Sequence, residues 1–209
     1  MSRSDSKVSG FALAVLVLCA VAFGVSYLMP SSGSASPGYH DMAAPAAPVR
    51  LVVPALKIRA PITPIVVKDG VLDPPRNPRD VGWWKASARA GATQGQTVLT
   101  GHTVHTGGGV MDKLGTLRKG QLVKVVTRKG PMVYRTTKVV TWTKEQLAKR
   151  SVQLFSQDRG DGRLVLITCS QWTGSHYKSN VVVFAEPLGV PDKQAQKKAE
   201  KKAEKKAEK

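Results

Sequence analysis

The sequence is short of the residues that covalent cross-links and metal centres require. It has 2 cysteines and 4 histidines among 209 residues. Two cysteines are too few for the disulfide framework of a small secreted domain. No group of His, Cys and Asp has the spacing of zinc ligands, and the acidic residues of 49–188 are scattered rather than clustered. We therefore expect a protein that needs no metal and no cofactor.

Acidic and aromatic residues are also scarce. The chain has 14 Asp and Glu against 32 Lys and Arg, a net charge of +18, and only 6% of its residues are aromatic. The excess of positive charge remains when the ends are set aside, because residues 49–188 alone hold 22 Lys and Arg against eight Asp and Glu. Such a surface suits a polyanionic partner. Nucleic acid is the least favoured one, because aromatics are few and no recognised binding motif occurs.

Residues 8–29 form an uncharged, largely apolar run. About 20 apolar residues cross the hydrocarbon core of a bilayer, so this run predicts a single transmembrane signal-anchor. A cleaved signal peptide is the alternative, since residues 34–36 offer small side chains for cleavage, but its apolar region is usually only about 7–15 residues long. Arg3 and Lys7 favour a cytoplasmic position for residues 1–7. The sequence thus predicts a single-pass cell-membrane protein whose remaining chain is extracellular.

The remaining chain divides by composition into three parts. Residues 30–48 are rich in Pro, Ala, Ser and Gly, which is typical of a flexible linker. Residues 49–188 have the composition of a folded domain. Residues 189–209 end in a Lys/Ala/Glu repeat without an apolar face, which predicts a disordered or partly helical tail. An alternative role for this tail is binding to anionic envelope polymers or lipid head groups.

The domain has the pattern of a mostly β protein. Its short β-branched runs are separated by Gly and Pro, and they cover residues 51–53, 62–67, 97–100, 122–127, 132–142, 164–168 and 181–185. Seven or more short strands without βαβ alternation favour a barrel or a sandwich. One or two short helices are expected. Thr143 and Gln146 form a capping box that opens residues 144–150, and residues 110–114 are the second candidate.

Two strand ends carry side chains suited to catalysis. Cys19 lies within the predicted span, so Cys169, at the end of the run LVLITC, is the one thiol of the exported domain. His102 ends the run TVLTGH. Each residue alone fits a structural role, because free cysteines are usually small buried residues. Together they suggest a cysteine nucleophile activated by an imidazole.

The other three histidines are weaker candidates. His105 is a rival imidazole, three residues beyond His102, in a glycine-rich loop. His40 falls in the predicted linker. His176 is closer to the thiol in sequence but has no assigned role.

The two strands TVLTGH and LVLITC resemble the signature strands of sortases, the membrane-anchored cysteine transpeptidases of Gram-positive bacteria. The resemblance covers residues 49–188. It extends to the motif VGWW at residues 81–84, to residues 114–126, and to the closing strand NVVVFA at residues 180–185. The compact domain and single anchor resemble actinobacterial sortases of classes E and F.

The resemblance implies a closed eight-stranded β-barrel with Cys169 and His102 at neighbouring strand ends. Cys169 would attack the Thr–Gly bond of an LPXTG-like sorting signal at the C-terminus of a secreted protein. A thioester would form, and an amine of a cell-wall precursor would resolve it. His102 would protonate the departing amine and deprotonate the incoming one.

The sequence departs from the family at one position. Sortases carry an Arg on the closing strand, but no Arg follows Cys169 in this chain, and Asn180 occupies that position. Asn180 could donate a neutral hydrogen bond to an oxyanion. Lys178 lies two residues earlier, so on a strand it would share the face of Asn180. We expect one or both to replace the Arg.

Two other functions remain open from the sequence. The same thioester could be resolved by water, which would make the protein a thiol-dependent hydrolase or endopeptidase. The positive charge also allows a basic module that binds envelope polymers without catalysis.

Overall fold

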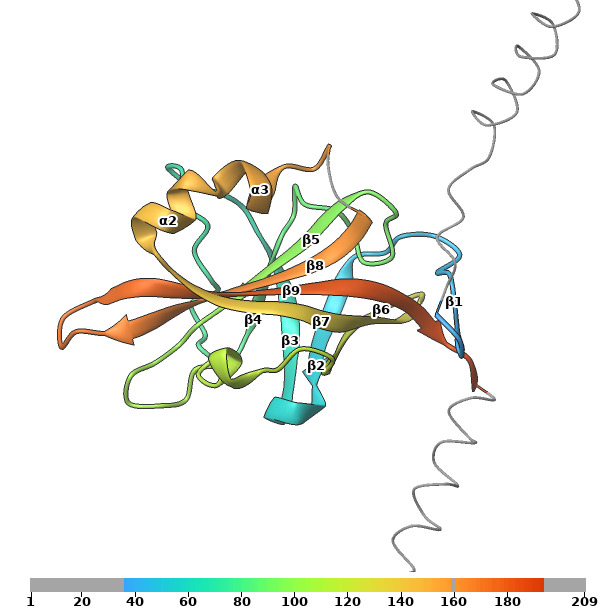
Figure 1. Ribbon diagram of the computed structural model, residues 1–209, viewed down its shortest axis with the longest axis horizontal. Coiled ribbons are helices and arrows are strands. Elements are labelled where there is room, and N and C mark those ends of the chain that lie inside the picture. Colours follow the sequence, from blue (N-terminus) through green and yellow to red (C-terminus); the bar gives the residue numbers. More distant parts are fainter. Residues whose placement is uncertain (1–35, 159–160, 194–209) are drawn as a thin grey trace, which may run out of the picture. The chain divides into compact units, whose positions relative to one another are not determined.

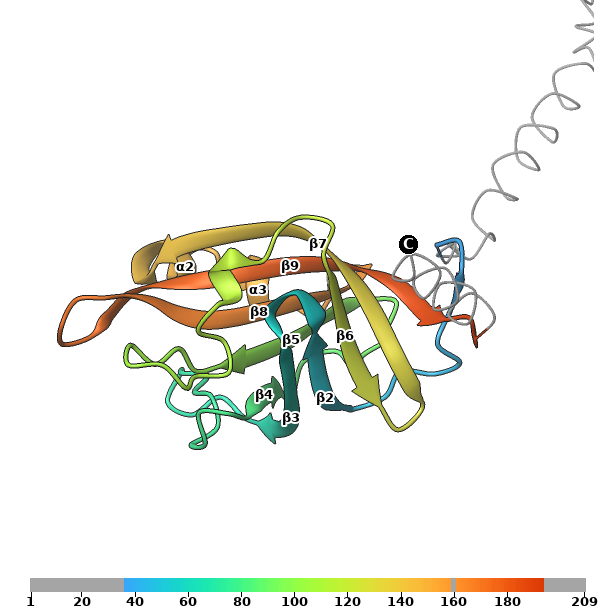
Figure 2. The same ribbon diagram turned by 90° about the horizontal axis from the view of Figure 1, so that it is seen from below.

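The computed structural model describes residues 36–158 and 161–193, which contain nine strands (Figures 1 and 2). The strands are β1 (Tyr39–His40), β2 (Pro48–Val53), β3 (Ile58–Ile65), β4 (Val81–Trp84), β5 (Gly95–Gly101), β6 (Leu122–Thr127), β7 (Gly130–Thr143), β8 (Asp161–Trp172) and β9 (Tyr177–Pro191).

The strands close into an eight-stranded barrel. Their order is β1-β9-β7-β6-β2-β3-β4-β5-β8, and a further pairing of β8 with β9 closes the ring, with β1 outside it on β9. Most neighbours are antiparallel, but β3 pairs parallel with β4 and β5 pairs parallel with β8. The predicted mostly β fold, in its closed-barrel form, is confirmed.

Short helices lie in three of the connections between strands. The capping box forms as predicted, since the Thr143 hydroxyl accepts a hydrogen bond from the Gln146 amide and the Gln146 side chain accepts one from the Thr143 amide. It opens α2 (Lys144–Lys149), which is followed by α3 (Ser151–Phe155). Two further helices, η1 (Pro54–Leu56) and η2 (Leu114–Thr116), are single 3₁₀ turns.

The predicted helix over residues 110–114 is wrong. Turns occupy this segment, and η2 begins only at its last residue. The Met111 amide donates to the His102 carbonyl, and the Leu114 amide donates to the Met111 carbonyl. A hydrogen bond between residues three apart and a hydrogen bond to the end of β5 take the place of the i+4 hydrogen bonds of a regular α-helix.

Strand structure also extends beyond the predicted 49–188 domain at both ends. β1 lies in the predicted linker, and β9 continues into the predicted tail. The two extensions pair with each other, Tyr39 opposite Pro191 and His40 opposite Val190, and the His40 imidazole lies 2.7 Å from the Asp192 carboxylate. His40 is therefore part of this pairing.

The predicted cytoplasmic end at 1–7, the predicted span at 8–29 and most of the predicted tail lie outside the described residues. Among the helices that the structure does describe, none has the length and apolar character to cross a membrane.

Two apolar clusters lie on opposite faces of the sheet. Alternate side chains of the strands fill the barrel, where Leu99, Leu164, Leu166 and Tyr134 are fully buried. The intervening side chains form a second cluster on the outer face, made by Val98, Val165, Ile167, Val182 and Phe184 together with Leu154 of α3. This division follows from the two-residue period of a strand.

Replacement of an interior leucine should destabilise the barrel. Leu99→Ala removes a fully buried side chain from β5, and such truncations cost about 2–5 kcal/mol of unfolding free energy. Leu122→Ala, on β6, is the matched control because Leu122 is 40% exposed and should lose much less. Urea unfolding of both variants measures the difference, and equal losses would contradict the interior position of Leu99.

Candidate functional site

Three neighbouring strands carry polar side chains at the same level: Cys169 lies within β8 rather than at its end, Asn180 lies within β9, and His102 directly follows β5. β5 and β8 run parallel, with Val98 opposite Val165 and Thr100 opposite Ile167. His102 and Cys169 each follow these last partners by two residues. Across the antiparallel pairing of β8 with β9, Cys169 lies directly opposite Asn180. The register therefore brings these three predicted site residues to one edge of the barrel.

The same three positions share one face of the sheet. Val98, Val165 and Val182 belong to the outer apolar cluster. Because side chains alternate along a strand, the positions of His102, Cys169 and Asn180 continue the same outer face. An apolar surface covered by α3 thus ends in an imidazole, a thiol and an amide.

The His102 ring is held by the loop before β4. Its Nε2 atom lies 2.8 Å from the Pro75 carbonyl oxygen, and since a carbonyl can only accept, Nε2–H is the donor. This bond leaves Nδ1 as the second ring nitrogen for proton transfer. Within the described residues no hydrogen bond joins the His102 ring to Cys169, so the structure represents a site in which the imidazole is engaged elsewhere.

Cys169 is a half-buried free thiol. Burial raises its pKa, the positive charge of Lys144 opposes this rise, and the carboxylate of Asp73 adds to it. Burial dominates, so the thiol is protonated at neutral pH in this state. Sequence reasoning missed Lys144, which was noted only as the first residue of a helix. The register does identify its position, because β7 runs beside β9 up to Thr143, opposite Ser179.

Asn180 and Lys178 differ in their surroundings. The Asn180 side chain donates from Nδ2 to the Thr168 carbonyl at 3.2 Å. This bond uses one of the two N–H donors of the amide and leaves the other. Lys178 is exposed. Both positions lie on the outer face by strand alternation, Asn180 beside the thiol and Lys178 farther toward the β8–β9 hairpin.

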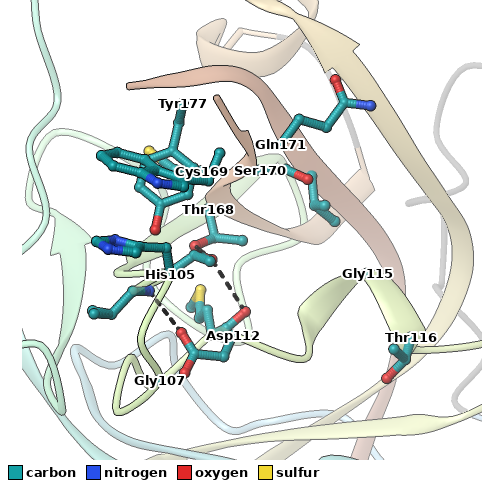
Figure 3. Close-up of a pocket in the computed structure, with 15 residues that line it drawn as sticks. His105, Gly107, Asp112, Gly115, Thr116, Thr168, Cys169, Ser170, Gln171 and Tyr177 are labelled. Atoms are coloured by element: carbon teal, nitrogen blue, oxygen red, sulfur yellow. Dashed lines mark hydrogen bonds between the residues drawn. The ribbon is translucent and has the colours of Figure 1, made fainter. Parts of the chain in front are cut away.

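A pocket of about 560 Å³ adjoins the thiol at this edge of the barrel (Figure 3). Its walls come from the loop after β5 and from the β8–β9 hairpin, and its lining includes Cys169, His105, Asp112, Trp172 and Tyr177. The loop is held over the strand end by the Asp112 carboxylate, which accepts hydrogen bonds from the amides of Val104 and Gly109 at 2.8 and 3.0 Å.

Aromatic rings form one wall of this pocket. The His105 ring stacks on Trp172 with ring centres 4.3 Å apart and planes 5° apart, and Trp172 contacts Tyr177 with centres 5.0 Å apart. Among the residues that the structure describes, the Tyr177 hydroxyl oxygen is shielded from solvent and meets no hydrogen-bond partner at bonding geometry. Burial outweighs the neighbouring His105 backbone and raises the pKa of Tyr177.

Sequence reasoning missed this aromatic wall. A usable signal existed, since Trp172 and Tyr177 flank the Gly174 turn and face each other across the hairpin. His105 lines the pocket, whereas His176 is exposed near the hairpin tip, where its ring nitrogen contacts the hydroxyls of Thr173 and Ser175. Within the described ranges, no group of three or more His, Cys, Asp and Glu is arranged to hold a metal ion.

Comparison with known proteins identifies the fold and the domain. Residues 51–188 match a family model described as "Sortase domain". No curated protein matches the chain significantly.

Solved structures of sortases share the fold. Sortase A from Corynebacterium diphtheriae is 15% identical, with a TM-score of 0.56 over 88% of each chain. Streptococcus agalactiae sortase C1, in complex with MTSET, is 15% identical, with a TM-score of 0.56 over 90% of this chain and 96% of that one. Sortase C-1 from Actinomyces oris is 20% identical, with a TM-score of 0.52 over 84% and 99%.

The environment of the thiol predicts how its reactivity depends on pH. Only the thiolate is nucleophilic, and burial raises the pKa of Cys169, so alkylation by iodoacetamide should be slow at pH 7 and still rising at pH 9. Lys144→Met removes an opposing positive charge and should move the rate profile to higher pH. Lys149→Met, at the other end of α2, is the control. Modification of Cys169 is read by peptide mass, and a plateau already reached at about pH 7 would contradict the burial argument.

Proposed function

Because the chain belongs to the sortase family, we propose that it is a membrane-anchored cysteine transpeptidase that cleaves an LPXTG-like sorting signal between Thr and Gly. The acyl product is carried as a thioester on Cys169 and transferred to a cell-wall amine. The substrates are secreted proteins with such a signal at their C-terminus, and the setting is the outer surface of a Gram-positive cell membrane. Membership of class E or F remains part of this proposal.

One observation supports the proposal: by the register of β5, β8 and β9, the positions of His102, Cys169 and Asn180 lie at the same height along adjoining chain segments. Cysteine acyl transfer needs a sulfur nucleophile, a nearby proton carrier and a hydrogen-bond donor for the oxyanion. Rigid strands that fix all three on one face keep the cost of bringing them together low.

The proposed reaction has two acyl-transfer steps. The Cys169 thiol proton passes to His102, the sulfur attacks the Thr carbonyl carbon, the Thr–Gly C–N bond breaks, and His102 passes that proton to the departing amine. The incoming amine then attacks the thioester carbonyl, the C–S bond breaks, and the proton lost by the amine returns through His102 as the thiol is restored. Since Pro75 holds Nε2 of His102 in this state, the ring has to use Nδ1 or leave the Pro75 carbonyl.

Oxyanion stabilisation is assigned to the residues that replace the family Arg. The unused N–H of Asn180 is a neutral donor on the residue directly across from Cys169. Lys178 adds a positive charge on the same face, although an ammonium lacks the planar fork of Arg. Lys144 is a second source of positive charge, because it already acts on the thiol.

The two sides of the thiol suit the two substrates. Partly buried apolar side chains packed against the outer cluster, Leu72 and Trp142 among them, offer a surface for the apolar residues of a sorting signal. The pocket beyond the thiol is lined by rings that can contact a cation through their faces and by an unpaired hydroxyl. We assign this pocket to the acceptor amine.

Incubation of the full chain with LPXTG and LAXTG peptides, with and without candidate amines, tests the function by product mass. A thioester at Cys169 and an amide product that requires the amine would support transpeptidation. A free carboxylate product in the presence of every amine would favour the hydrolase alternative. Unchanged function after Cys169 is blocked by a thiol reagent would leave only the non-catalytic polymer-binding module.

Cys169→Ala should abolish thioester formation. Asn180→Ala should lower the acylation rate about 10- to 1000-fold, the range for loss of an oxyanion donor, and Lys178→Ala should have a smaller effect. Gln121→Ala is the control, since Gln121 is an amide whose side chain accepts a hydrogen bond from the Arg118 amide, outside the loop that holds His102. Wild-type acylation by the Asn180 variant would show that another group replaces the Arg.

Tyr177→Phe should change the fate of the thioester rather than its formation. The substitution removes only the unpaired hydroxyl from the pocket, so the ratio of amide to hydrolysis product should fall about 2- to 10-fold, as expected for one hydrogen bond. Acylation by the peptide should be unaffected. Tyr39→Phe, in β1, is the control. An unaltered ratio, or an equal loss in acylation, would argue against an acceptor site here.

A further inference from the structure

A second cleft lies at the end of the barrel away from the thiol. Its volume is about 350 Å³, and it is lined by three cations, Arg89, Arg128 and Lys129, and by the apolar side chains of Pro45, Ala46, Ala47 and Val49. The β6–β7 hairpin, which carries Arg128 and Lys129, and the β8–β9 hairpin, which borders the catalytic pocket, lie at opposite ends of the domain (Figures 1 and 2). The catalytic chemistry does not use this cleft.

Hydrogen bonds fix the segments that present the cations. In the β6–β7 turn, the Thr127 hydroxyl donates to the Gly130 carbonyl at 2.8 Å and accepts from the Lys129 amide at 3.0 Å. The Ala46 amide donates to the Ala90 carbonyl at 3.0 Å, which holds the apolar side of the cleft beside Arg89. The cations are therefore presented together by a fixed backbone.

The positive charge of this cleft is uncompensated. None of its lining residues is acidic, and none of the three cations has an ion-pair partner within residues 36–158 and 161–193. Arginine side chains donate paired hydrogen bonds to phosphate oxygens, and lysine adds a point charge. The chemistry of the cleft is thus that of a phosphate-binding site with an apolar margin, which includes Val49 at 39% exposure.

The course of the chain points to one source of phosphate. The described chain enters the domain at this end, through β1 and then residues 45–49. The predicted span ends at Met29, and the residues from there to Pro45 extend at most about 55 Å. The chain that would lead from the anchor therefore enters the domain at the end that holds the cleft. Basic side chains with exposed apolar neighbours are typical of surfaces that meet anionic head groups.

We propose that the cleft formed by Arg89, Arg128 and Lys129 binds the phosphate head groups of anionic phospholipids. The barrel then stands with this end on the membrane and its catalytic end toward the wall. This proposal rests on the proposed membrane anchor but not on the proposed transpeptidase activity.

Lysine footprinting of the full chain in lipid nanodiscs tests the proposal. Acetylation of Lys129, read by peptide mass, should be at least about 5-fold slower in discs of phosphatidylcholine with phosphatidylglycerol than in discs of phosphatidylcholine alone. Lys119, next to the opposite end of β6, is the internal control and should react equally in both. The double variant Arg89→Gln, Arg128→Gln keeps Lys129 as the reporter and should lose the protection, whereas Arg118→Gln should keep it.

The remaining outcomes each overturn the proposal. Equal acetylation of Lys129 in the two kinds of disc excludes head-group binding. Protection by soluble poly(glycerol phosphate) in detergent, with none in discs, assigns the cleft to a wall polymer. Failure of the chain to enter discs refutes the anchor and the membrane contact with it. Peptide cleavage measured in the same discs reports separately on the proposed activity. Every variant keeps the Lys-rich tail, so a difference between variants does not come from the tail.

Discussion

The site depends on the position of β8 between β5 and β9. One strand pairs parallel on one side and antiparallel on the other, and this double pairing closes the barrel. The same double pairing sets Cys169 at the same height along the strands as His102 and Asn180. A slip of one residue in either register would turn the thiol from the outer face into the barrel. Closure of the fold and assembly of the site are thus the same constraint, and the buried leucines that hold the register also hold the site.

The electrostatics of the site depend on neighbouring elements as well as on these strands. Burial keeps the proton on the thiol, and the charge that opposes burial comes from Lys144, placed by the Thr143 capping box at the end of β7. The imidazole is occupied by the Pro75 carbonyl. In the described state the thiol keeps its proton, and proton transfer by His102 would have to use Nδ1 or a change of partner at Nε2. Under the proposed function, binding of a sorting signal would accompany this change of partner.

Much of the barrel could be predicted from local sequence, because β-branched runs and glycine turns report directly on short strands. The capping box at Thr143 could be read from two residues. The helix predicted at 110–114 failed because the segment bonds to the end of β5, a tertiary contact with no local signal. The pairing of β1 with the end of β9 was missed for the same reason, since a two-residue strand carries almost no pattern.

The candidate site divides in the same way. Cys169 and His102 could be named because each ends a strand with a distinctive sequence. Their roles and those of Asn180 and Lys178 remain predictions. Lys144, Trp172 and Tyr177 could not be found by motif, because they reach the site only through the β7–β9 register and the β8–β9 hairpin.

The buried, protonated state of Cys169 has a consequence for the lifetime of the protein. Peroxides attack thiolates far faster than thiols, so a sulfur with a raised pKa is slow to form sulfenic acid. In a chain exported as we propose, no second cysteine of the domain is available to rescue a damaged one. Under the proposed function, a site that withholds the thiolate would therefore preserve the sulfur between encounters with substrate.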